Sequence, residues 1–224
     1  MSRAKDSSTR RIILVHAYRH SLPPIEKAFR DLWPEAEALN LVDESLYADV
    51  TPDGVVDATV PSRMRALFAH CLASGAHAIV FTGSTFGPVV EEARLGLPIP
   101  IFKSDEAMAE EVVARGGKVL LVCTARRAAP VIAANIEAAA RRADATIELE
   151  TLVVDAAKEA ISKGDIARHD QLIADAIAGR TDVRSIVLGQ LSMSNVPALV
   201  PAQIAENIVS GAEASVRALR SLLS

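Results

Sequence analysis

Hydrophobic and polar positions alternate between two patterns: short runs rich in Val, Ile and Leu, and longer stretches with apolar residues every third or fourth position. The short runs predict strands at residues 11–16, 38–42, 78–82, 99–103, 118–124, 146–154, 185–190 and 207–210. The helical spacing predicts helices at residues 23–33, 61–74, 87–95, 105–115, 129–143, 165–178, 195–205 and 212–223. Residues 46–60 are less regular and include a predicted turn at residues 51–54. Because strands alternate with helices, we expect an α/β fold with parallel sheets.

The order of these elements repeats within the chain. The run IVFTGSTF at residues 79–86 aligns without gaps with IVLGQLSM at residues 186–193, an offset of 107 (190 − 83). The same offset aligns LVHA at residues 14–17 with LVCT at residues 121–124. This repeat predicts an internal duplication that gives two pseudo-symmetric parallel-sheet βα halves with a site between them.

The halves are expected at residues 11–107 and 108–211, with the helix at 212–223 returning to the first half. Residues 1–10 are polar and are predicted to form a flexible N-terminal tail. They lack the apolar segment of a signal peptide, so we expect a cytoplasmic protein.

Composition narrows the classes of function. The chain has 224 residues, of which 50% are apolar and only 4% aromatic, which predicts an aliphatic core of parallel strands and Ala-rich helices. A net charge of −4 without a basic stripe argues against nucleic-acid binding. No apolar run approaches the length of about 20 residues that crosses a membrane. The two isolated cysteines provide neither a disulfide framework nor metal-ligand spacing, so no metal site is predicted.

Candidate chemistry lies at the predicted carboxyl ends of the strands, where open α/β sheets bind ligands. Polar and small residues at these ends are His16, Tyr18, Gly83, Ser84, Thr85, Lys103, Cys123, Thr124, Gln190, Ser192 and Ser210. The segment at residues 82–85 leads from a strand toward a helix, so its N–H groups and hydroxyls suit an anion such as a carboxylate. The alternative is an ordinary turn in which Ser84 and Thr85 are helix caps. The glycine patterns of nucleotide-binding loops are absent from the sequence, and no cofactor is expected.

Three of these residues are candidate bases, and each has a structural alternative. Lys103 is a partner for a substrate carboxylate or a base when desolvated; the alternative is a solvated surface lysine. His16 suits a base near neutral pH, or a hydrogen-bonded structural histidine. Cys123 is a third candidate, but a buried thiol without a nearby charge partner stays protonated. Gln190 is interpreted as a neutral hydrogen-bonding amide or a packing amide, and His169 with Asp170 as helix surface or a local hydrogen bond.

The chain resembles the aspartate/glutamate/hydantoin racemase superfamily, which also contains arylmalonate decarboxylase and maleate isomerase. The resemblance covers roughly residues 11–223 and rests on the two related halves, the strand ends at 80–85 and 187–190, and the strand at 120–124. Racemases of this kind use one cysteine from each half, and the resemblance places those positions at Gly83 and Gln190. It therefore implies a branch that lacks both catalytic cysteines. It also implies that Ser84, Thr85 and Thr124 hold the substrate carboxylate, with Ser192 as the second-half counterpart.

Two functions follow from this combination. The first is a cofactor-independent isomerase- or lyase-type enzyme that acts on a small carboxylic acid, with Lys103, Cys123 or His16 replacing the missing base. Two-base racemisation is not expected, because neither glycine nor glutamine accepts a proton usefully. The alternative is a catalytically silent carboxylate-binding protein. The resemblance also suggests a homo-oligomer.

Overall fold

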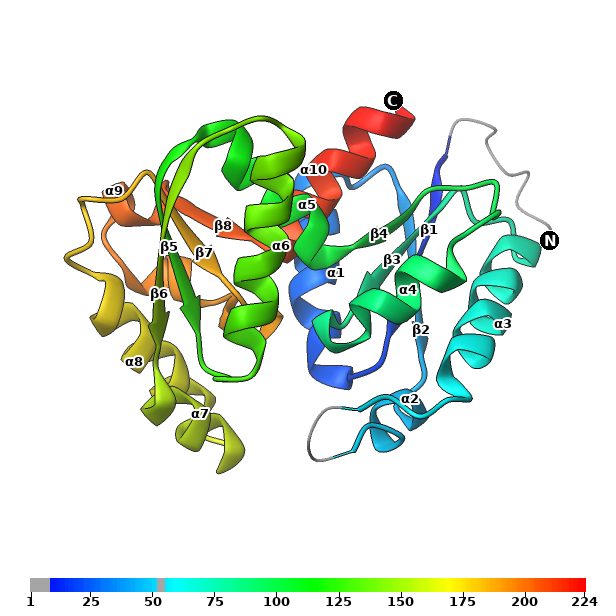
Figure 1. The fold of residues 1–224 in the computed structure, drawn as a ribbon, viewed down its shortest axis with the longest axis horizontal. Helices are drawn as coiled ribbons and strands as arrows, with labels where there is room; N and C mark the ends of the chain where they lie inside the picture. The colour runs from blue at the N-terminus through cyan, green and yellow to red at the C-terminus, as the bar shows by residue number, and fades with distance from the viewer. Residues whose placement is uncertain (1–8, 52–54) are drawn as a thin grey trace. The chain divides into compact units, whose positions relative to one another are not determined.

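The computed structural model describes residues 9–51 and 55–224. Most of the predicted N-terminal tail and of the predicted turn at residues 51–54 therefore lies outside the described residues. The chain divides into two compact units, Met1–Ser104 with Ser215–Ser224, and Asp105–Ala214. Figure 1 draws the chain from blue at the N-terminus to red at the C-terminus.

The first unit is a four-stranded parallel sheet in the order β2-β1-β3-β4, with helices along it. Its strands are β1 (Arg11–His16), β2 (Glu37–Val42), β3 (Ala78–Thr82) and β4 (Ile101–Lys103). Its helices and 3₁₀ turns are η1 (Arg19–Ser21), α1 (Leu22–Leu32), α2 (Ser45–Ala48), α3 (Val60–Ala73), η2 (Ser84–Phe86) and α4 (Gly87–Ala93). The end of α10 (Gly211–Leu223) is tied to this unit, because the Arg220 side chain donates a 2.6 Å hydrogen bond to the Leu32 carbonyl.

The second unit has the same strand order, β6-β5-β7-β8, and all its pairs are parallel. Its strands are β5 (Gly117–Cys123), β6 (Ile147–Val153), β7 (Ser185–Leu188) and β8 (Ile208–Ser210). Its helices and 3₁₀ turns are α5 (Ser104–Arg115), α6 (Ala128–Arg142), α7 (Asp155–Ser162), α8 (Ile166–Ile177), η3 (Leu191–Met193), η4 (Val196–Leu199) and α9 (Ala202–Ala205).

The registers of the two sheets repeat each other. The pairs Ile12–Ala78 and Val119–Ser185 differ by 107 positions on both strands (119 − 12 and 185 − 78). In the β1–β2 ladder the offset on the second strand grows to 111 (148 − 37), and α6 has 15 residues where α1 has 11. The extra four residues thus correspond to about one added helical turn. The prediction of an α/β fold with two similar parallel-sheet halves is confirmed.

Buried aromatic rings pack against one another in the core of the first unit. Phe81 at the end of β3 packs edge-on against Phe68 of α3, with centroids 6.4 Å apart, and against Phe86 of η2 at 5.8 Å. Each such pair contributes about 0.5–1.5 kcal/mol beyond its buried area. The core of the second unit is aliphatic, as predicted, and is built on Leu120 and Ile173. The rings of Phe81 and Phe86 therefore hold both ends of the short segment that joins β3 to η2.

The helices differ from the sequence prediction at three places. The predicted helix at residues 195–205 is wrong: the segment forms η4 and α9, separated by an extended Val200. The cause is Pro201, because a proline disfavours helical geometry in the residue before it. The helices α2 and α7 were not predicted. Within residues 9–51 and 55–224, no helix has both the length and the apolarity needed to span a membrane.

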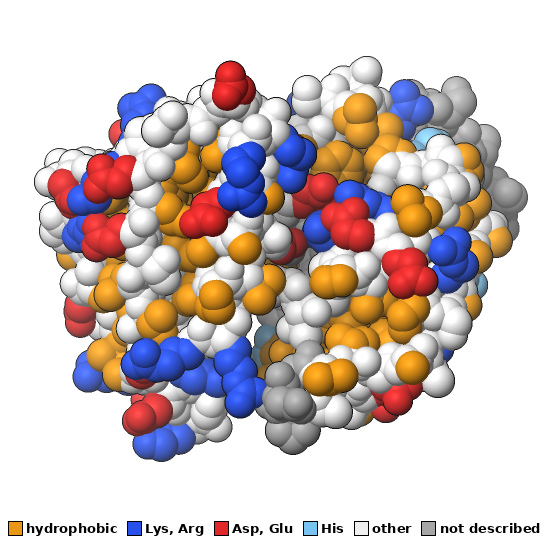
Figure 2. Space-filling model, viewed as in Figure 1, with side chains coloured by type: hydrophobic (Ala, Val, Ile, Leu, Met, Phe, Trp, Pro, Cys, Tyr) orange, Lys and Arg blue, Asp and Glu red, His pale blue; other side chains and the backbone are white. Residues whose placement is uncertain are grey.

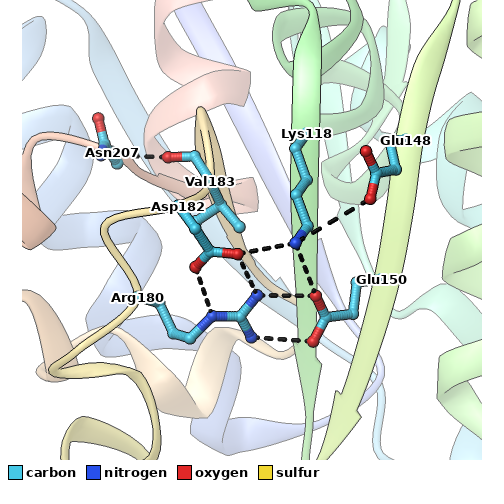
Figure 3. Close-up of polar contacts among 7 residues, drawn as sticks. All are labelled: Lys118, Glu148, Glu150, Arg180, Asp182, Val183 and Asn207. Atoms are coloured by element: carbon cyan, nitrogen blue, oxygen red, sulfur yellow. Dashed lines mark hydrogen bonds and ion pairs between the residues drawn. The ribbon is translucent and has the colours of Figure 1, made fainter.

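Charged side chains close the amino ends of the strands in the second unit (Figure 3). Lys118 Nζ lies 2.7 Å from Asp182 Oδ2 and 3.4 Å from Glu150 Oε2. The Arg180 guanidinium bridges the same two carboxylates, 2.7 Å from Glu150 and 2.9 Å from Asp182. These contacts hold the loop before β7 against β5 and β6, so the polar groups at this edge are already paired with each other.

Candidate functional site

The carboxyl ends of the strands in the first unit bring several predicted residues together. His16 is the ladder partner of Thr82, and Phe81 is the partner of Lys103. The ends of β1, β3 and β4 are therefore adjacent, and Gly83 follows directly after Thr82. The strand pairing thus groups His16, Gly83 and Lys103, which were predicted independently from the sequence.

The segment from Gly83 to Thr85 carries donors that the fold does not use. Ser84 and Thr85 open the 3₁₀ turn η2, so their N–H groups have no acceptor within the helix. No side chain caps η2 or α4, so the alternative of Ser/Thr caps does not describe this segment. Neither hydroxyl has a hydrogen-bond partner among the described residues, with Ser84 half-buried and Thr85 exposed. Two N–H groups and two hydroxyls are thus uncommitted at the end of β3.

A side chain at position 83 would crowd two aromatic rings. A Cβ atom at this position would lie 3.1 Å from the Phe81 ring and 3.4 Å from the Phe86 ring. The backbone itself is extended, so a larger residue meets crowding and not backbone strain. A cysteine at this position would require one ring to shift by a few tenths of an ångström.

His16 is enclosed in a complete hydrogen-bond network. Its Nε2 lies 3.0 Å from Asn40 Oδ1, and the Asn40 amide nitrogen donates to Glu26. The amide oxygen therefore faces the ring, so Nε2 carries the proton and Nδ1 accepts. The acceptor Nδ1 lies 2.7 Å from Thr82 Oγ1 and 2.8 Å from Ser21 Oγ.

Burial keeps this imidazole neutral. His16 is fully buried, and desolvation lowers its pKa below the usual histidine range, with Asn40 and the charge of Glu26 opposing that shift only in part. Both ring nitrogens are occupied, so no lone pair is free for a substrate proton. The geometry matches the structural alternative for His16, which joins the ends of β1 and β3.

The Lys103 ammonium is already engaged in an ion pair. Its ammonium lies 2.5 Å from Glu91 Oε1 of α4, and its side chain is only 13% exposed. Burial raises the pKa of Glu91, but the hydrogen bond from Lys103 and the charges of Lys103 and Arg94 outweigh it, so the pKa is lowered. A paired ammonium can donate to a second carboxylate, whereas service as a base requires it to lose its proton first.

In the second unit, the predicted residues meet at the ends of β5 and β7. The Thr124 N–H donates a 2.9 Å hydrogen bond to Gln190 Oε1, and Thr124 Oγ1 lies 3.4 Å from the same oxygen. The Gln190 amide nitrogen is buried without a hydrogen-bond partner among the described residues. Gln190 therefore links the two strands through its oxygen and leaves its N–H₂ group as an unused donor.

Cys123 lies beside this amide and is fully buried. Desolvation raises the pKa of its thiol, and the neighbouring Gln190 offsets that rise only in part. The sulfur also leaves no space for a side chain at position 189. A Cβ at Gly189 would lie 2.7 Å from Cys123 Sγ and 3.0 Å from the Val122 carbonyl oxygen. The thiol is therefore protonated at neutral pH and tightly packed.

Two further residues of the predicted set have smaller roles in the second unit. Ser192 is half-buried in η3, at the position that corresponds to Thr85 (192 − 107). The Ser210 hydroxyl accepts a 3.4 Å hydrogen bond from the Glu213 N–H and caps α10. Ser192 thus remains a binding candidate, whereas Ser210 has a local structural role.

Several polar residues at these edges were missed by sequence reasoning. Asn40 and Ser21 hold His16, yet neither stands in a recognisable motif near it. Lys and Arg side chains gather at the lower end of the second unit in Figure 2. The connection from β5 to α6 contains the exposed Arg126 and Arg127, and Arg126 pairs with Asp155. The available signal was the pair of adjacent arginines that begins three residues after β5 ends.

His169 and Asp170 form a buried polar pair in α8. The helix-surface alternative for them is wrong because both side chains are buried, whereas the local hydrogen bond is confirmed, with His169 Nδ1 2.7 Å from Asp170 Oδ1. Asn195 donates to the second Asp170 oxygen at 3.0 Å. Within the described residues, no group of three or more His, Cys, Asp and Glu side chains is arranged to hold a metal ion.

Solved structures with the same fold include racemases. The chain aligns with allantoin racemase from Klebsiella pneumoniae at 16% identity and a TM-score of 0.68, covering 96% of this chain and 88% of that one. It aligns with an aspartate racemase homologue from Pyrococcus horikoshii at 16% identity and a TM-score of 0.68, covering 96% and 99%. It aligns with glutamate racemase from Thermus thermophilus in complex with β-chloro-D-alanine at 19% identity and a TM-score of 0.63, covering 97% of this chain and 82% of that one. At these identities the likeness establishes the fold alone.

Sequence comparison identifies the family. A search of curated protein sequences finds no match. The profile of the Asp/Glu/hydantoin racemase family, however, matches residues 19–219, which is most of the chain. The chain therefore belongs to the Asp/Glu/hydantoin racemase family.

Proposed function

We propose that this protein binds a small carboxylic acid through residues at the carboxyl ends of its strands. The observation that carries the proposal is the set of uncommitted donors at Ser84 and Thr85. A carboxylate presents only acceptors and takes several hydrogen bonds at once, so it complements such a set. The proposed ligand-binding residues are Gly83, Ser84, Thr85, Thr124, Gln190 and Ser192.

Binding is better supported than proton abstraction. His16 has both nitrogens occupied, Lys103 is paired with Glu91, and the raised pKa of Cys123 keeps its thiol protonated. Neither Gly83 nor Gln190 can supply a base in their place. We therefore propose carboxylate binding as the function that the geometry supports best, and we expect no two-base racemisation.

A second candidate is a cofactor-independent lyase- or isomerase-type activity. Its support is the position of the protonated Cys123 thiol beside Thr124 at the end of β5, and transfer of its proton to a substrate requires that the buried side chain become accessible. In a decarboxylation, the C–C bond to the carboxylate breaks, CO₂ leaves with no electrons from that bond, and the carbanion takes the thiol proton. Solvent then returns a proton to the thiolate. This candidate needs one acid and no base.

The two functions are separated by proton NMR in deuterated water. The protein is incubated with a panel of small mono- and dicarboxylic acids, and the α-proton signals are followed over time. Shifted or broadened ligand signals without exchange or product support binding alone. Loss of an α-proton signal, or a decarboxylated product, supports the enzyme. If no acid responds in either way, both proposals are wrong.

The ligand contacts are tested with matched variants. Ser84→Ala and Thr85→Val each remove one hydroxyl, and we expect each to weaken binding about fivefold to tenfold, which corresponds to one net hydrogen bond. Thr146→Val is the control, because Thr146 is exposed and precedes β6 at the opposite end of the strands. If the control weakens binding as much as the two test variants, the assignment of the site to the Ser84–Thr85 segment is wrong.

The missing thiols can be restored. A Gly83→Cys/Gln190→Cys variant supplies both family cysteines, and α-proton exchange in deuterated water would then appear with an acid that binds the wild type. We expect reduced stability as well, since the new Cβ at position 83 meets the Phe81 and Phe86 rings. A folded double variant that binds an acid and exchanges no proton would show that more than the thiols has been lost.

We further propose a cytoplasmic homo-oligomer that uses no cofactor. The support for the compartment is the free, buried state of Cys71 and Cys123, which suits a reducing environment, and the homo-oligomer follows from the family resemblance alone. The molar mass in solution, measured by light scattering against the 23.8 kDa of the chain, tests the oligomer.

A further inference from the structure

Both tyrosines of this chain are exposed at the same edge of the first unit. The sequence contains only two, Tyr18 and Tyr47. Tyr18 follows β1 and is 51% exposed, and Tyr47 lies in α2 after β2 and is 47% exposed. In a chain with so few aromatic residues, two half-exposed rings at the carboxyl ends of adjacent strands form a distinct surface feature.

The rings form a continuous row. The centroids of Tyr18 and Tyr47 are 5.8 Å apart, and His20 lies 4.9 Å from Tyr18 on its other side. Tyr47 in turn packs edge-on against the buried Phe86 at 6.0 Å. Phe86 ends the 3₁₀ turn that Ser84 begins. The row, which we call the aromatic ledge (Tyr18, His20 and Tyr47), therefore leads inward to the segment with the uncommitted donors.

Hydrogen bonds hold the ledge in register with that segment. The Ser21 hydroxyl lies 2.7 Å from the Tyr18 carbonyl oxygen and 2.8 Å from Thr82 Oγ1. Ser21 and Thr82 are both buried, so this link is shielded from water. Because Thr82 directly precedes Gly83, the ledge and the donor segment share one rigid support.

The charges beside the ledge cancel each other. Arg19, between Tyr18 and His20, donates a 2.6 Å hydrogen bond to Glu44, which lies three residues before Tyr47. Because Arg19 and Glu44 neutralise each other, neither places an unpaired charge beside the tyrosine rings. The surface offers π faces and ring edges to a neutral flat group, which gains from offset-stacked or edge-on contact.

We propose that the carboxylic acid bound by this protein has a planar unsaturated substituent that packs against Tyr18 and Tyr47. The inference rests on the proposed function, because it assumes that the donors at Ser84 and Thr85 hold the carboxylate. It adds the chemical class of the remainder of the ligand: an aryl or heteroaryl acid.

The test compares three acids with the wild-type protein by calorimetry or NMR titration. Phenylacetate has a planar ring, cyclohexylacetate has a saturated ring of similar size, and acetate has no ring. We expect phenylacetate to bind about threefold to tenfold more tightly than cyclohexylacetate, the range that aromatic contacts give. Acetate should bind most weakly.

Variants then assign the preference to the ledge. Tyr18→Leu and Tyr47→Leu should each reduce the preference for phenylacetate over cyclohexylacetate, while Tyr18→Phe and Tyr47→Phe should retain it. Leu95→Ala, which changes another exposed apolar side chain of this unit, is the control and should leave the preference unchanged.

The outcomes separate this inference from the proposed function. If all three acids bind with equal affinity, or the preference survives in both leucine variants, the ledge has no role in recognition although carboxylate binding stands. If no acid binds, the proposed function is wrong and the inference fails with it. The wild-type comparison decides the question even if a variant does not fold.

Discussion

Replacing His16 by leucine is expected to destabilise the first unit. The imidazole is fully buried and makes hydrogen bonds to Thr82, Ser21 and Asn40. Leucine has a comparable volume but can make none of them. Because Thr82 is itself buried, its hydroxyl loses this acceptor where water cannot replace it, whereas the Ser21 hydroxyl keeps the Tyr18 carbonyl as its acceptor.

The magnitude follows from these contacts. Each lost hydrogen bond to a buried hydroxyl removes about 1 kcal/mol, and leaving a buried polar group unsatisfied costs about 1–3 kcal/mol. Asn40 is exposed, so its oxygen regains a water partner at little cost. The sum is roughly 2–4 kcal/mol, which corresponds to a fall in Tm of roughly 5–15 °C.

The lowered pKa of His16 also predicts that the stability of the folded protein depends on pH. The pKa of His16 is lowered in the folded state, so below about pH 6.5 the unfolded chain binds a proton that the folded chain excludes. The stabilising contribution is therefore fully present above about pH 6.5 and is lost as the pH falls toward the folded-state pKa. Within that window the wild type should lose up to about 1.4 kcal/mol per pH unit from this group.

Thermal and urea unfolding of the wild type and His16→Leu between pH 5 and pH 8 would test both expectations. The difference in stability between the two proteins should be largest near pH 8 and should shrink as the pH falls below 6.5. His70→Gln is the control, because His70 is exposed on α3 and its change should alter stability by less than about 0.5 kcal/mol. A His16→Leu protein as stable as the wild type at pH 8, or a difference that does not vary with pH, would refute the reasoning.

Three other perturbations test the second unit. Gly189→Ala places a Cβ within 2.7 Å of Cys123 Sγ and should lower the free energy of unfolding in denaturant by about 1–3 kcal/mol. Gly179→Ala, with open space around the new Cβ, should leave it almost unchanged, and equal effects of the two substitutions would contradict the packing argument. The Cys123 thiol is buried and its pKa is raised, so it should resist iodoacetamide at pH 8 in the folded protein and react after unfolding. Peptide mass spectrometry follows the labelling, and rapid labelling of the native protein would disprove the burial of this side chain. Hydrogen bonds from Arg180 and then Lys118 lower the pKa of Asp182, so its contribution is present above about pH 3.9 and is lost at lower pH. Asp182→Asn should therefore lower Tm at pH 7 in low salt, with a smaller effect in 1 M salt, and a salt-independent difference would argue against an electrostatic origin.

Much of the fold could be predicted from local patterns. The strands at residues 11–16 and 78–82 were predicted with the bounds that β1 and β3 have, because short β-branched runs buried on both faces leave a clear signal. The offset of 107 residues likewise anticipated the matching registers of the two sheets. The helix at residues 195–205 failed because its apolar spacing continued across Pro201, whose local effect interrupts the helix.

The positions of the candidate site were also accessible from the sequence. Ligands in open α/β sheets bind at the carboxyl ends of parallel strands, so the predicted strand ends led to Ser84, Thr85 and Thr124 as proposed ligand contacts.

The sequence by itself determined the order of the strands, the repeat of the two halves and the strand ends at which ligands are expected, because all three depend on local residue patterns. Only the tertiary structure decided what the polar residues there can do. His16 became a neutral, occupied imidazole because Asn40 and Thr82 reach it from neighbouring strands, and Lys103 became an ion-paired donor because Glu91 faces it from α4. Protonation and availability depend on burial and on partners distant in the sequence, which no local pattern encodes.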